Sequence, residues 1–148
     1  MGGFFEEQEV LSKMEHSKPL TTKLGIKECT RLLILNRPDN LGDALKLPKN
    51  SSIVSQLHEP FDMVLLFTKE SKELEQVLPT LKKTLPRNGA LWISWPKKAS
   101  KIKSDLDENV VRRLGLKNDL VDVKVCSIND VWSGLKFVHR RKEEERLG

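Results

Sequence analysis

The stretch with the most chemical potential is "ALWISWPKKASK", Ala90 to Lys101, in which an apolar run carries two tryptophans and leads into three lysines. Trp92 and Trp95 are three positions apart, so in a regular strand they point to opposite faces. Trp92 is therefore predicted to lie in the core. Trp95 stands beside Pro96 at the expected end of the strand and is predicted to line a crevice. Lysines around an indole ring suit a flat, anionic ligand.

Polar side chains also follow the other apolar runs of the chain. In open α/β sheets, ligands bind outside the carboxyl ends of the strands, at the point where the strand order reverses. Four turns are expected to meet there, and they supply the candidate ligand-binding residues Asn36, Arg37, Asp39, Lys69, Trp95, Lys97, Lys98, Asp130, Trp132 and Ser133. A structural alternative is equally open: "PKKASKIKSD" is then a solvated basic loop, and Trp95 and Trp132 pack against each other.

Other catalytic and metal chemistries lack their motifs. The three histidines, His16, His58 and His139, have no zinc-binding spacing. There is no G-x-S-x-G turn for a hydrolase serine and no G-x-x-x-x-G-K phosphate loop. We therefore predict no catalytic residue, no metal and no cofactor.

Short apolar runs predict the strands that position these turns. The runs at 31–36, 61–67 and 90–95 show no alternation, which is typical of strands buried on both faces. The segment 51–57 predicts a weaker edge strand. In 121–127, Val121, Val123 and Val125 alternate with polar residues, which predicts an edge strand whose valines face the core.

Two helices are predicted between the strands. Leucines and a valine form a one-sided stripe over 71–85, with Ser71 as the N-cap and with Pro79 causing a kink or a division into two shorter helices. The second helix is expected over 105–114. Asp105 and Glu108 resemble a capping box at its start, and Gly115 is expected to end it.

The order of these elements predicts the fold class. Strands that alternate with helices indicate a doubly wound α/β sheet. Only "INDVWS" separates the fifth strand from the sixth, over 134–140, and a parallel crossover needs about a dozen residues. The last two strands must therefore be antiparallel neighbours. We predict an amphipathic arm over 1–18, one domain over 19–141 and a charged tail over 142–148.

Two resemblances follow from these segments. "FDMVLLF", "GALWISWPKKASK" and "LVDVKVCSINDVWSGLKFV" resemble a family of short bacterial proteins known as a domain of unknown function, which implies no chemistry. The element order over roughly 24–140 resembles the S-adenosylmethionine-dependent methyltransferases. That resemblance implies a three-layer Rossmann-like fold with the strand order 2-1-3-4-6-5, in which strand 6 is antiparallel.

The methyltransferase cofactor motif is degenerate in this chain. The class needs a glycine-rich turn after its first strand, so that backbone can approach the ligand. Here Arg37 and Pro38 stand in that turn and Gly42 comes late. Glu59 lies before Pro60 in a loop, and no other acid suits the ribose position after strand 2. The fold is expected to be retained and the cofactor site lost.

Composition limits the partners. The net charge of +5 favours anionic ones. No apolar run approaches the roughly 20 residues that span a membrane. Cys29 and Cys126 suit reduced, buried thiols, and the expected location is the cytoplasm.

Three functions are in competition. A non-catalytic module that binds an anionic small molecule or protein partner is favoured. A divergent methyltransferase, with Asp39 or Asp130 in a polar role, comes second. Nucleic-acid binding through "KKASKIK" is third, because aromatic residues make up only 5% of the chain. Dimerisation stays open.

Overall fold

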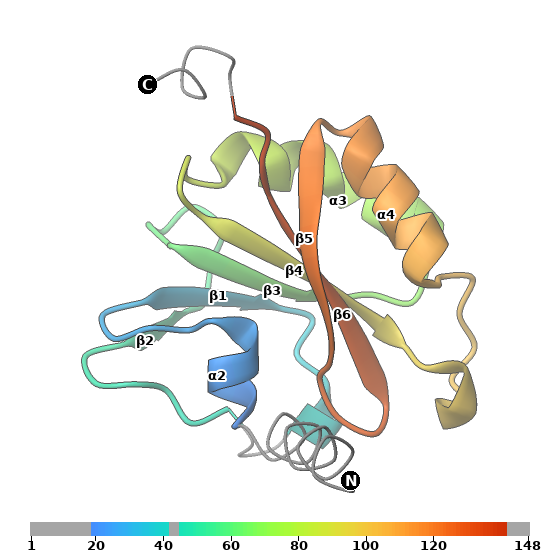
Figure 1. The fold of residues 1–148 in the computed structure, drawn as a ribbon, viewed down its shortest axis with the longest axis horizontal. Helices are drawn as coiled ribbons and strands as arrows, with labels where there is room; N and C mark the ends of the chain where they lie inside the picture. Colours follow the sequence, from blue (N-terminus) through green and yellow to red (C-terminus); the bar gives the residue numbers. More distant parts are fainter. Residues whose placement is uncertain (1–18, 42–44, 142–148) are drawn as a thin grey trace, which may run out of the picture.

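A computed structural model describes residues 19–41 and 45–141, so the predicted arm, the predicted tail and Gly42 lie outside the described residues (Figure 1). The described strands are β1 (Arg31–Leu35), β2 (Ser52–Val54), β3 (Met63–Phe67), β4 (Ala90–Pro96), β5 (Leu120–Ser127) and β6 (Trp132–His139). The helices are α2 (Leu20–Leu24), α3 (Ser71–Thr84) and α4 (Glu108–Lys117), with single 3-10 turns η1 (Asp39–Leu41) and η2 (Lys98–Ser100).

Within this part of the chain, six strands form one sheet in the order β2-β1-β3-β4-β6-β5. Strand β1 pairs in parallel with β2 and β3, and β3 pairs in parallel with β4. Strand β6 runs antiparallel to both β4 and β5. The predicted α/β class, strand order and reversed last strand are confirmed. The cause is the short turn 128–131, which leaves no room for a crossover.

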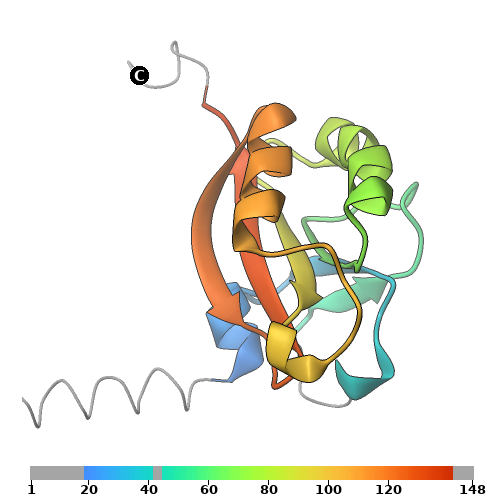
Figure 2. The same cartoon turned by 90° about the vertical axis from the view of Figure 1, so that its right-hand side faces the viewer.

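The sheet has a hydrophobic core on each face. Helices α3 and α4 cover one face, and α2 lies on the other (Figure 2). Leu91, Ile93 and Trp95 of β4 belong to the core beneath α3 and α4, whereas Trp92 belongs to the core beneath α2. The prediction that Trp92 is buried and faces away from Trp95 is confirmed, and both indoles are almost fully enclosed.

The start of α3 is held by a residue from another loop. The predicted N-cap Ser71 is wrong, since Ser71 is the first helical residue and Glu70 precedes it without a side-chain cap. The Asp105 carboxylate instead accepts hydrogen bonds from the Ser71 backbone N–H at 2.8 Å and from its hydroxyl at 2.6 Å. Because Asp105 serves α3, the predicted capping box of α4 is also wrong. Asp107 takes that role and accepts from the Val110 N–H at 2.8 Å.

Neither predicted interruption divides a helix. Helix α3 is continuous through Pro79, so the expected division into two shorter helices is wrong. Pro79 lies on the exposed side, where the backbone carbonyl that loses its partner can be solvated. Helix α4 runs past Gly115 to Lys117. A Cβ at Gly115 would lie within 2.7 Å of Phe137 Cδ1, so glycine is required there by packing against the sheet, not as a stop signal.

Strand β5 is at the edge of the sheet as predicted, but its alternation is not regular. The register shifts between Asp122 and Lys124, which makes Val123 a bulge residue. Val123 is 54% exposed and Val125 is 49% exposed, so the prediction that these valines face the core is wrong. A bulge adds one residue to a strand, so each side chain after it points to the face of the sheet opposite to the one that regular alternation predicts.

The two cysteines differ in their surroundings. Both are free thiols. Cys126 is partly buried, and burial raises the pKa of its thiol. Cys29 is exposed in a left-handed turn before β1, so the expectation that both are buried is wrong for Cys29.

The Asp105 cap predicts a loss of stability in acid. The hydrogen bond from the Ser71 side chain lowers the pKa of Asp105 below its usual value. A lowered pKa in the folded state stabilises the fold above the unfolded pKa, near 3.9, and this contribution disappears as the pH falls through the folded value. Asp105→Asn should therefore make the urea midpoint less dependent on pH below about pH 4. Equal profiles for wild type and Asp105→Asn would contradict the prediction.

Candidate functional site

A hollow of about 560 Å³ lies at the carboxyl ends of β1 and β3. Strand β2 lies on one side of β1 and β3 on the other, so this is where the strand order reverses. Open α/β sheets bind ligands at that position. The lining residues come from the loop after β1, the end of β3, the first turn of α3, the loop after β4 and the start of β6: Asn36, Arg37, Pro38, Asp39, Asn40, Phe67, Thr68, Lys69, Glu73, Ile102 and Trp132.

Asn36 joins the two strands at one side of this hollow. Its φ of 57° places it in the left-handed region, which asparagine tolerates better than most residues. Its amide Nδ2 donates to the Phe67 carbonyl at 3.1 Å and to Glu73 Oε1 at 3.0 Å. The side chain that follows β1 is therefore tied to β3 and α3.

Trp132 forms a fixed wall of the hollow. The indole is only 4% exposed and meets the Phe67 ring edge to face, with centroids 5.1 Å apart and planes at 85°. Its Nε1 donates to Asn40 Oδ1 at 3.0 Å. Asn129 in the turn before β6 also donates to the Asn40 carbonyl, at 3.2 Å. The loop after β1 is thereby linked to the β5–β6 turn.

The structure brings half of the candidate residues to this hollow. Asn36, Arg37, Asp39, Lys69 and Trp132 line it. Trp95, Lys97, Lys98, Asp130 and Ser133 do not. Trp95 is enclosed beneath α3 and α4 because β4 continues through Pro96, so its expected place in the crevice is corrected. It does not pack against Trp132 either, since the two indoles belong to cores on opposite faces of the sheet.

The other absent candidates have separate positions. Lys97 Nζ donates to Ser127 Oγ at 2.6 Å, and Lys98 begins the exposed turn η2. Asp130 is exposed in the β5–β6 turn, and Ser133 pairs with Trp95 inside the sheet. Lys97 therefore lies beside the β5–β6 turn, and among the lining residues of the hollow the loop after β4 supplies Ile102.

Six lining residues were not among the candidates: Pro38, Asn40, Phe67, Thr68, Glu73 and Ile102. Glu73 lies in the first turn of the helix that follows β3, and a helix that follows a parallel strand starts at its carboxyl edge, so topology could have indicated it. Pro38, Asn40, Phe67 and Thr68 lie within two positions of a candidate residue in the sequence. Ile102 lies in an irregular loop, and no pattern in the sequence signals it.

The charge of the hollow is balanced. Arg37 and Lys69 line the same hollow as Asp39 and Glu73. Cationic groups bind carboxylate or phosphate, and carboxylates accept hydrogen bonds from hydroxyl or amino groups. The hollow suits a ligand that carries both kinds of group.

No protein-family model matches the chain, and no curated protein matches it. Among solved structures, a S-adenosylmethionine-dependent methyltransferase from Aquifex aeolicus aligns with a TM-score of 0.55 at 12% identity, over 80% of this chain and 86% of that one. The PH0226 protein from Pyrococcus horikoshii OT3 aligns with a TM-score of 0.55 at 13% identity, over 90% and 92%. A protein from Sulfolobus solfataricus aligns at 17% identity with a TM-score of 0.47. That alignment covers 64% of the present chain and 61% of the length of the Sulfolobus protein.

The likenesses to the Aquifex aeolicus and Pyrococcus horikoshii proteins show the fold. The chain is an α/β protein with the Rossmann-like sheet of the methyltransferases. At identities this low, fold says nothing about chemistry, because one fold carries many functions.

The site residues fit the methyltransferase cofactor poorly. A glycine-rich turn would leave bare backbone against the ligand, but here the side chains of Asn36, Arg37 and Asp39 line the hollow. Glu59, the acid nearest the end of β2, is exposed in a turn and is absent from the lining. Over the described residues, the two contacts that define such a cofactor site are therefore missing, and we derive no reaction step through it.

Two other kinds of feature are absent from the same part of the chain. Over 19–41 and 45–141, no group of three or more histidine, cysteine, aspartate or glutamate side chains gathers that could hold a metal ion. No helix there is both long enough and apolar enough to cross a membrane.

Proposed function

We propose that the chain is a non-catalytic binding module that holds a small ligand with an anionic group in the hollow between β1 and β3. The observation that carries this proposal is the convergence of Asn36, Arg37, Asp39, Lys69 and Trp132, from three separate segments, on one hollow at the reversal of strand order. Its concave shape favours a small molecule over a protein surface.

The lining defines the ligand further. Arg37 and Lys69 take the anionic group, and Arg37 offers the planar fork that suits phosphate or carboxylate. Asp39 accepts from hydroxyl or amino groups on the same ligand. Phe67 and Trp132 give the hollow a rigid aromatic side. A nucleoside monophosphate has all of these features and is a suitable first probe.

A divergent methyltransferase is the second candidate, and the shared fold is the observation that favours it. Of its two candidate polar acids, Asp39 lines the hollow and Asp130 does not. Nucleic-acid binding through Lys97, Lys98 and the following loop ranks third, since that loop offers no aromatic side chain for a base to stack on.

The three tryptophans provide a direct test. Trp132 lines the hollow, whereas Trp92 and Trp95 are buried elsewhere in the two cores. In ¹⁵N–¹H spectra of the full chain, adenosine monophosphate should shift the Trp132 indole signal and leave the other two in place. Lys69→Gln removes one charged contact and should weaken this binding about tenfold, since such a contact is worth roughly 1.5–3 kcal/mol.

The control for Lys69→Gln is Lys46→Gln, which removes the same charge from an exposed loop. It should change the affinity less than about twofold. No Trp132 shift with adenosine monophosphate, or equal weakening in both variants, would count against the proposal. A Trp132 shift with S-adenosylmethionine and S-adenosylhomocysteine alone would favour the methyltransferase. Saturable binding of a single-stranded oligonucleotide that Lys97→Gln weakens, with Trp132 unmoved, would favour nucleic acid.

A further inference from the structure

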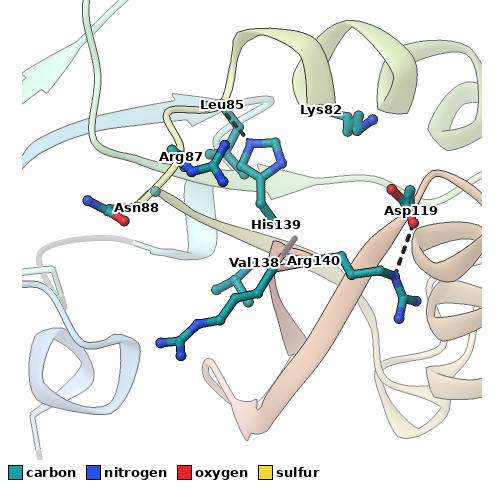
Figure 3. Close-up of a pocket in the computed structure, with 10 residues that line it drawn as sticks. Lys82, Leu85, Arg87, Asn88, Asp119, Val138, His139 and Arg140 are labelled. Carbon is teal, nitrogen blue, oxygen red and sulfur yellow. Dashed lines mark hydrogen bonds and ion pairs between the residues drawn. The ribbon is translucent and has the colours of Figure 1, made fainter. Parts of the chain in front are cut away.

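A second hollow, of about 840 Å³, lies at the opposite edge of the sheet (Figure 3). It forms where α3 and β6 end and where β4 and β5 begin, and its walls include Leu85, Gly89 and Val138. Strand β4 runs from this hollow toward the other edge, and its seven residues span about 20 Å at about 3.3 Å each. The two hollows are therefore separate places.

This hollow is strongly cationic. Lys82, Arg87, Arg140 and Arg141 line it, and Asp119 is the single carboxylate among its lining residues. The first hollow, by contrast, has two cations and two carboxylates. The net charge of +5 favours anionic partners, and this hollow offers an anion a larger excess of cationic side chains than the first hollow does.

Two contacts hold the walls in place. His139 Nε2 lies 2.8 Å from the Leu85 carbonyl oxygen at the end of α3, and Arg140 Nε donates to Asp119 Oδ1 at 3.0 Å. Figure 3 shows both contacts as dashed lines. A free carbonyl at a helix C-terminus repels anions. His139 is hydrogen-bonded to the Leu85 carbonyl oxygen, so this oxygen is not free to repel an anion in the hollow.

We propose that this hollow binds a small molecule that carries two or more phosphate groups. Four cationic side chains exceed the charge of one phosphate, and arginine forks match phosphate oxygens in pairs. The lining has no phenylalanine or tryptophan on which a base could stack. Recognition therefore rests on the phosphates. The volume also falls within the roughly 300–1,000 Å³ of small-ligand sites.

Calorimetry of the full chain with sodium tripolyphosphate at low ionic strength tests this proposal. Wild type should bind one equivalent. The double variant Arg87→Gln/Arg140→Gln should bind at least about tenfold more weakly, since it removes two charge-assisted contacts. Lys46→Gln/Lys49→Gln loses the same net charge from an exposed loop and should change the affinity less than about twofold.

A second pair guards against misfolding. Arg140 also holds Asp119, so circular dichroism should confirm that the first variant folds, and Lys82→Gln/Arg141→Gln should weaken binding similarly. Tripolyphosphate should leave the Trp132 indole signal unmoved, which separates this site from the first hollow. Absent binding, a shifted Trp132, or equal losses in the hollow and loop variants would overturn the proposal. So would an oligonucleotide that binds more tightly than tripolyphosphate and depends on Arg87 and Arg140.

Discussion

Replacement of Gly115 with valine is expected to lower the free energy of unfolding by about 3 kcal/mol or more, at the upper end of the range for overpacked cores. A Cβ at this position of α4 would lie well inside van der Waals contact with the Phe137 ring, which is itself fully buried in β6. Neither the helix nor the sheet can move away without opening the core between them. Urea denaturation followed by circular dichroism would measure the loss.

A double-mutant cycle shows whether the Phe137 ring causes this effect. Gly115→Ala gains about 1 kcal/mol of helix propensity and should still destabilise the wild type. In a Phe137→Leu background the smaller side chain leaves room, so Gly115→Ala should there be nearly neutral. If the alanine costs the same in both backgrounds, the close approach to Phe137 is not the reason for glycine.

Trp92→Ala is expected to cost about 3–5 kcal/mol, the range for truncation of a buried aromatic side chain. The indole is fully buried beneath α2, and its Nε1 donates to the Leu24 carbonyl at 2.9 Å. This hydrogen bond joins the end of α2 to the centre of the sheet. The variant loses core volume and leaves that carbonyl without its donor. Thermal unfolding would measure the total effect.

Trp92→Phe separates the two contributions. It keeps the larger part of the apolar contact but removes the N–H donor and part of the ring volume, so it should cost about 1–3 kcal/mol for the unsatisfied buried acceptor and less than Trp92→Ala in total. Amide exchange in α2 should accelerate more than exchange in α4. Equal acceleration of exchange in both helices, or no loss of stability in Trp92→Phe, would show that the bond to Leu24 has no separate role.

Much of the sheet could be predicted from short stretches of sequence. An apolar run without alternation needs two covered faces, and β3 and β4 are buried along their whole lengths. The reversal of β6 followed from the length of one turn. Both inferences depend only on neighbouring residues, which is why the structure confirms them.

Helix ends were predicted less well because the decisive partners are distant in sequence. Ser71 and Asp105 are each plausible caps by residue type, yet the structure pairs them with each other across 34 positions. Gly115 resembles a stop signal by local rules. Its actual constraint comes from Phe137, on a strand that a one-dimensional pattern cannot place.

The candidate site, like the helix ends, could be predicted only in part, because some of its positions depend on contacts between segments that are distant in sequence. Topology alone places the loops after β1 and β3 together, and Asn36, Arg37, Asp39 and Lys69 lie there. The loop after β4 was expected to join them. The extra residue of strand at Pro96 instead keeps Trp95 inside the sheet, and Lys97 continues toward Ser127. A difference of one residue in where β4 ends therefore decides which side chains of the following loop line the hollow, and Ile102 does so in place of Trp95 and Lys97.

The irregular register at Val123 has a consequence for how copies of this chain behave at high concentration. An outer strand with free backbone groups and exposed valines is a template on which other strands can add and aggregate. The displaced residue interrupts the even spacing of those groups, and the Lys124 ammonium beside it adds a charge that an incoming strand would have to desolvate. The valines can therefore stay exposed at this border without promoting aggregation.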